Sequence, residues 1–102
     1  MQEELKAIKR EFSVIDEFNI YNTESKQFDM LESDHCVDMV QSMDELDCLN
    51  EMNQINLDSE EANYFIIKGI NHRLAVIRLN NKVDYNKALF TIKVKTLIKS
   101  IE

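Results

Sequence analysis

The residues best suited to bind a metal ion are His35, Cys36 and Cys48, with Asp34 and Asp38 close by in the sequence. Zinc sites use imidazole, thiolate and carboxylate ligands, and they usually draw two of them from one turn, as in CxxC or HxxxH. Here His35 and Cys36 are adjacent, which on a helix separates their directions by about 100°. No CxxC is present, so we expect no metal site and interpret both cysteines as reduced thiols in the core.

The carboxylates around these residues could bind calcium or act as general acids and bases. An EF-hand loop requires a glycine at its sixth position, whereas residues 44–51 and 58–61 contain none. Neither His35 nor His72 lies in a known nucleophile motif. A chain with a single glycine also cannot form a glycine-rich phosphate loop. The sequence therefore predicts a protein that is not an enzyme and has no cofactor.

The charges of the 102-residue chain are divided into blocks. Residues 29–61, here called the acidic block, contain eleven Asp and Glu and no Lys or Arg. Residues 62–102, the basic block, contain eight Lys and Arg and two acids. A surface of one sign attracts partners of the opposite sign, and a net charge of −7 opposes binding to nucleic acid. The acidic block therefore predicts a basic protein partner. It could instead be a solvated surface, or pair with the basic block within the fold or between copies.

Apolar periodicity predicts the elements that carry these charges. Residues 2–18 place apolar side chains at helical spacing and predict an amphipathic helix, followed by a polar turn at residues 19–26. Residues 28–31 fit a short extended segment. In the acidic block an apolar stripe runs from Cys36 through Leu46 to residue 52 and predicts an acidic helix. That helix would begin after Ser33 or Asp34 and be either continuous or divided near residue 41. Residues 53–61 are interpreted as a connection.

The basic block begins with strand-like sequence. Residues 64–68 and 73–79 are rich in aromatic and β-branched residues and flank Gly69, whose freedom to adopt a positive φ suits a hairpin turn. Residues 85–101 fit a C-terminal helix beginning at Asp84, which we favour, or a third antiparallel strand. The helix would carry a second apolar stripe, which needs burial on a second side: Tyr85, Ala88, Leu89 and Ile92.

These elements predict an α+β fold in one domain, residues 1–102. It comprises an N-terminal amphipathic helix, an acidic central helix or two short helices, a β-hairpin, and the C-terminal helix or third strand. The longest apolar runs, residues 64–67 and 74–77, are too short to span a membrane, and the N-terminal residues do not form a secretory signal. We therefore expect a cytoplasmic protein.

In size, acidity and lack of catalytic motifs the chain resembles bacterial immunity proteins of contact-dependent or colicin-type toxins. The resemblance implies an immunity protein or protein antitoxin that neutralises a nuclease toxin, because nuclease clefts are basic and attract acidic inhibitors. Two alternatives are an oligomeric structural or adaptor protein and a phage-type DNA mimic that inhibits a host nuclease. Flexible apolar anchors would come from Met30, Met39, Met43 and Met52. The acids expected to contact the partner are Asp38, Asp44, Glu45, Asp47, Glu51, Asp58, Glu60 and Glu61.

Overall fold

The structure is a computed structural model that describes residues 2–46, 53–69 and 72–99. The predicted α+β class is confirmed, including the N-terminal, central and C-terminal helices. The elements of the described residues are α1 (Gln2–Glu11), β1 (Ile15–Asn22), β2 (Gln27–Met30), α2 (Val37–Glu45), β3 (Gln54–Asp58), β4 (Asn63–Lys68), β5 (Arg73–Leu79) and α4 (Lys87–Lys99). No helix within these described ranges is long and apolar enough to cross a bilayer.

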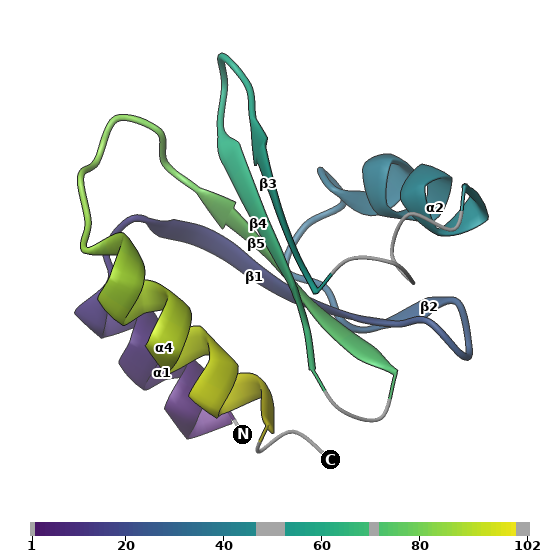
Figure 1. Cartoon of the computed structure of the whole chain (residues 1–102), viewed down its shortest axis with the longest axis horizontal. Coiled ribbons are helices and arrows are strands. Elements are labelled where there is room, and N and C mark those ends of the chain that lie inside the picture. Colours follow the sequence, from purple (N-terminus) through teal and green to yellow (C-terminus); the bar gives the residue numbers. More distant parts are fainter. Residues whose placement is uncertain (1, 47–52, 70–71, 100–102) are drawn as a thin grey trace.

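The strands form one antiparallel sheet in the order β2-β1-β5-β4-β3. Helices α1 and α4 lie on one face of this sheet and α2 lies on the other (Figure 1). Along β5, Ala75 and Ile77 belong to the core under α1 and α4, whereas Leu74 and Val76 belong to the core under α2. Because successive strand residues point to opposite faces, covering both faces buries nearly all of this strand.

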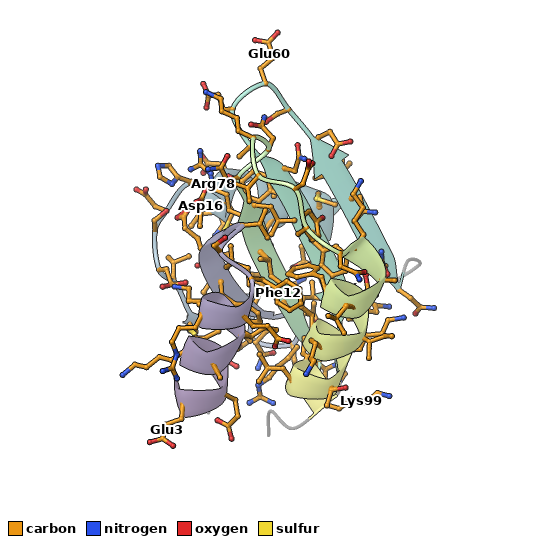
Figure 2. All side chains as sticks on the ribbon, turned by 90° about the vertical axis from the view of Figure 1, so that its left-hand side faces the viewer. Glu3, Phe12, Asp16, Glu60, Arg78 and Lys99 are labelled. Atoms are coloured by element: carbon orange, nitrogen blue, oxygen red, sulfur yellow. The ribbon has the colours of Figure 1, made fainter. Side chains whose placement is uncertain are left out.

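The helix predicted for residues 2–18 ends at Glu11, and β1 occupies its expected last turns and the first half of the polar turn, which is confined to residues 23–26. The helix and the turn are confirmed, but with wrong bounds, because Phe12 and Ile15 are buried for different reasons. Phe12 packs edge-on against Phe90 of α4 at 5.2 Å between ring centroids, and Figure 2 shows it between the two helices. Ile15 begins a strand whose alternation of apolar and polar residues is interrupted by a register shift between Ile15 and Glu17.

The predicted hairpin of β4 and β5 is confirmed, and the sheet is extended by β1 and β2 beyond β5 and by β3 beyond β4. The extended segment expected near residues 28–31 is β2, at one edge of the sheet. The connection expected for residues 53–61 is wrong, since β3 fills most of it and forms the other edge. In β3 only Ile55 and Leu57 are apolar, and both pack against the core under α2. Such a short alternation is easily mistaken for a polar loop.

The C-terminal segment forms helix α4, as favoured. Its first turn is capped by Asn86 rather than Asp84, because the Asn86 side-chain oxygen accepts a hydrogen bond from the Leu89 N–H at 3.0 Å. The buried side of α4 includes Phe90, whereas Leu89 and Ile92 are exposed, the latter by 62%. The expected burial of the second stripe is therefore wrong for Leu89, Ile92 and Ala88, and only Tyr85 of that stripe packs against the core.

The hairpin between β4 and β5 uses its glycine differently from the prediction. Positive φ occurs at His72, at 62°, and not at Gly69. Gly69 is required instead for close packing, because a Cβ at this position would overlap the side chain of Ile98 in α4. The glycine therefore lets the C-terminal half of α4 approach the end of the sheet.

The outer edge of β1 is covered partly by β2 and partly by a side chain. β2 pairs with β1 only from Ile20 to Asn22, with a register shift after Ile20. Further along β1, the carboxylate of Glu32 accepts a hydrogen bond from the Phe18 N–H at 2.5 Å and also contacts the Lys9 ammonium group. Glu32 thus occupies the place that a further residue of a neighbouring strand would take.

Candidate protein-binding surface

Helix α2 carries the central acids and is held on the sheet by one buried side. Cys36, Val40 and Asp44 follow each other at intervals of four residues and are all buried, as residues on one side of a helix must be. Asp38 and Glu45 lie on the opposite side and are exposed. The helix begins at Val37, later than predicted, and continues without a break near residue 41.

The prediction that Asp44 faces solvent is wrong. Its side chain is 6% exposed, and its carboxylate accepts hydrogen bonds from the Tyr21 hydroxyl at 2.8 Å and from Lys26 Nζ at 2.9 Å. Burial would raise the pKa of Asp44, but the hydrogen bonds from Lys26 and Tyr21 and the charge of Lys26 lower it below its ordinary value. Burial and the nearby carboxylate raise the pKa of Tyr21 to about 12. Asp44 therefore fastens the C-terminal end of α2 to β1.

The segment leading into α2 is held by a second polar network. His35 Nδ1 lies 3.0 Å from a carboxylate oxygen of Glu17, 2.7 Å from Ser33 Oγ and 2.7 Å from an Arg78 guanidinium nitrogen. Burial would raise the pKa of Glu17, yet hydrogen bonds from Ser33 and His35 and the charge of Arg78 lower it. Arg78 Nε is buried and has no hydrogen-bond partner among the described residues.

This second network contains a serine, a histidine and a glutamate, but it lacks the geometry of a catalytic triad. In a triad the nucleophile and the carboxylate bind opposite nitrogens of the imidazole, so that one accepts a proton while the other is held. Here Ser33, Glu17 and Arg78 all contact the same nitrogen, Nδ1. The arrangement therefore fits a connection between α2 and the sheet better than it fits a nucleophilic site.

The described cysteine, Cys36, is a buried free thiol, as predicted. Burial and the negative charge of Glu17 raise its pKa to about 11, so it is almost entirely protonated and unreactive at neutral pH. The Asn19 side-chain amide donates to its sulfur at 3.4 Å. The prediction for Cys48 lies outside the described residues. Within those residues no three metal-ligating side chains are grouped.

The acids expected to bind a partner fall into two separate patches. Asp38 and Glu45 are exposed on α2, while Asp58, Glu60 and Glu61 are exposed at the β3–β4 turn. Figure 1 shows α2 well away from this turn, and Figure 2 shows Glu60 projecting at its tip. The predictions for Asp47 and Glu51 lie outside the described residues. The structure therefore does not assemble the described acids into one continuous face.

The most exposed apolar side chain beside the acids of α2 is Leu46, and not one of the methionines expected to be anchors. Met39 and Met43 of α2 are half-buried against the core beneath this helix, and Met30 packs against the other core. The prediction for Met52 lies outside the described residues. Leu46 is 75% exposed directly after α2, although its helical spacing from Met43 suggested burial. Leu46 follows the buried Asp44 by two residues, which places it on the other side of the helix. This spacing could have predicted the exposure of Leu46 only if the burial of Asp44 had been known.

The lysines of α4, which make up half of the bases of the basic block, lie on the far side of the sheet from α2. Lys87, Lys93, Lys95 and Lys99 are exposed on α4, which covers the opposite face (Figure 1). An ion pair between the acidic and basic blocks joins Arg73 to Asp29 at 3.0 Å. The exposed lysines of α4 and the exposed acids of α2 are therefore on opposite faces of the sheet. No protein-family model matches the sequence, and no curated protein matches it.

Proposed function

We propose that this protein is a non-enzymatic inhibitor whose α2 surface binds and neutralises a basic protein, namely a nuclease toxin. The α2 surface comprises Asp38, Glu45 and Leu46. The proposal is carried by one observation: α2 presents exposed carboxylates on one face of the molecule, while the lysines of α4 lie on the opposite face. A basic partner would therefore be attracted to one side and repelled from the other.

The chemistry of a nuclease cleft explains the choice of partner. Such clefts carry Lys and Arg that bind a polyanionic substrate, and exposed carboxylates can occupy the same positions. Leu46 is available as an apolar contact beside Glu45, and desolvated apolar contacts hold complexes together after charges have steered their encounter. We place the protein in the cytoplasm, with support from the free thiol of Cys36.

The experiment takes as its target the basic C-terminal domain of any secreted protein whose gene lies next to the gene for this protein. Its cleavage of nucleic acid is measured with and without the purified inhibitor. The test variant is Asp38→Lys/Glu45→Lys, which reverses charge at two exposed α2 positions. The matched control is Glu3→Lys/Glu24→Lys, which makes the same change in net charge at exposed positions outside α2.

Wild-type protein and the control variant should both inhibit cleavage stoichiometrically. Each reversed α2 charge should cost about 1–2 kcal/mol of binding free energy, so the double variant should bind roughly 30-fold to 1000-fold more weakly. Inhibition that is equally strong with the α2 variant would show that α2 is not the interface. Absence of inhibition by the wild-type protein would contradict the proposed partner.

A further inference from the structure

The edge strand β3 is open to a further strand. Among the described residues, β4 pairs with one side of β3 and no strand pairs with the other. Its register with β4 is regular over its whole length, from Gln54 to Asp58, with no bulge. It contains no proline or lysine, which are the residues that commonly protect edge strands from pairing with another chain.

The direction of the free backbone groups follows from two hydrogen bonds at the ends of β3. The Lys68 N–H donates to the Asn53 carbonyl at 3.0 Å, and the Ser59 N–H donates to the Ala62 carbonyl at 3.0 Å. In an antiparallel pair, residues that exchange hydrogen bonds alternate with residues that do not. The odd-numbered residues of β3 therefore bond to β4. The N–H and C=O groups of Gln54, Asn56 and Asp58 point outward.

The sequence of β3 is complementary to itself in the antiparallel direction. With Asn56 placed opposite Asn56 of a second copy, Ile55 lies opposite Leu57 and Gln54 lies opposite Asp58. The apolar pairs fall on the face that contacts the core under α2, and cross-strand apolar pairs stabilise sheets. Within Gln54–Asp58 no two like charges face each other in this register. Asn56 itself is exposed, so its side chain leaves room for its symmetry mate.

Charge complementarity supports the same arrangement. Antiparallel pairing brings the acidic β3–β4 turn of one copy towards the opposite end of β3 in the other copy. At that end Lys95 and Lys99 of α4 line the same surface depression as Asn53. The exposed acids of the turn, Glu60 and Glu61, are therefore placed towards the lysine-bearing end of the neighbouring copy.

We propose that two copies of this protein pair through β3 to form a symmetric dimer with one continuous antiparallel sheet. The outward groups of Gln54, Asn56 and Asp58 would exchange about six backbone hydrogen bonds across the twofold axis. An interface of one strand pair is at the small end of specific interfaces, so we expect a dissociation constant on the order of 10 µM. This inference does not depend on the proposed inhibitor function, because it uses residues outside the α2 surface.

The first test compares edge variants by sedimentation velocity over a wide range of protein concentration. Asn56→Pro removes an outward N–H that makes no bond to β4, so the fold should persist. Asn56→Lys keeps every backbone group but places two ammonium groups opposite each other at the twofold axis. Both variants should dimerise at least tenfold more weakly than the wild-type protein. Ile92→Lys, at an exposed position of α4, is the control and should dimerise normally.

The second test examines the register. In the dimer, Gln54→Lys would place a lysine opposite Asp58 of the other copy at both symmetry-related positions. This variant should therefore tighten dimerisation several-fold. Gln54→Glu would place like charges opposite each other and should weaken it. A wild-type protein that stays monomeric up to about 1 mM, or a dimer unaffected by Asn56→Lys, would overturn the proposal. A dimer that responds to Asn56→Lys but not to the Gln54 variants would overturn the register.

Discussion

Replacing Asp44 by Ala tests whether this residue is a structural anchor or a docking carboxylate. The change leaves the hydroxyl of Tyr21, which is 1% exposed, without its acceptor, and an unsatisfied buried donor costs about 1–3 kcal/mol. Lys26 is 66% exposed, so losing its ion pair should add at most about 1 kcal/mol. Relief of the burial of Asp44 itself offsets part of this loss. We expect the free energy of unfolding to fall by about 2 kcal/mol.

The assay is urea unfolding followed by circular dichroism, with Tyr21→Phe and the double variant completing a double-mutant cycle. Tyr21→Phe removes the donor and leaves Asp44 paired with Lys26, so it should cost about 1 kcal/mol. The double variant leaves no orphaned hydroxyl, and its cost should be smaller than the sum of the single costs by about 1 kcal/mol. The Lys26→Ala variant should lose less than about 1 kcal/mol.

A loss of less than about 0.5 kcal/mol for Asp44→Ala would refute this reasoning, since exposed substitutions have effects of that size. Strict additivity between Tyr21 and Asp44 would also refute it, because residues that share a hydrogen bond should be coupled. In either case Asp44 would return to the set of carboxylates available to a partner.

The other predictions concern pH, the β4–β5 turn and the packing of α4. Because the pKa of Asp44 is lower in the folded state than its ordinary value of 3.8, its ionised form stabilises the fold at neutral pH, and this contribution is lost as the pH falls through the folded-state pKa. The stability difference between wild type and Asp44→Asn, measured by urea unfolding, should therefore shrink between about pH 5 and pH 2. Gly69→Ala should destabilise by about 1–3 kcal/mol through overlap with Ile98, and Ile98→Ala should reduce that penalty in a thermal unfolding cycle. His72→Gly should raise the unfolding free energy by up to about 1 kcal/mol by relieving the positive φ of 62°; a destabilised variant would contradict this.

Elements with strong periodicity could be predicted from the sequence, and elements with weak or interrupted periodicity could not. The buried stripe of α4 and the apolar runs of β4 and β5 gave the correct helix and hairpin. β1 was missed because its apolar residues continue the helical spacing of α1 through Ile15 and its register shifts after that residue. β3 was missed because only Ile55 and Leu57 mark it as a strand.

The candidate surface was predictable in composition but not in geometry. The sequence shows that the acidic block lacks bases, and the structure confirms that Asp38 and Glu45 are exposed. Whether Asp44 faces solvent depends on Tyr21, which lies on a strand 23 residues earlier. A contact between distant residues leaves no local periodic signal, so a buried and paired carboxylate cannot be distinguished from an exposed one by spacing alone.

The Glu32 carboxylate on the outer edge of β1 has a consequence for how far a shared sheet could grow. It fills the place of a strand residue next to Phe18, and β2 beyond it is only four residues long. That edge of the sheet therefore has fewer backbone groups available to pair with a strand of another chain than the β3 edge has. Pairing through β3 uses the same edge in both copies, so assembly should stop at two chains and not extend into a fibre.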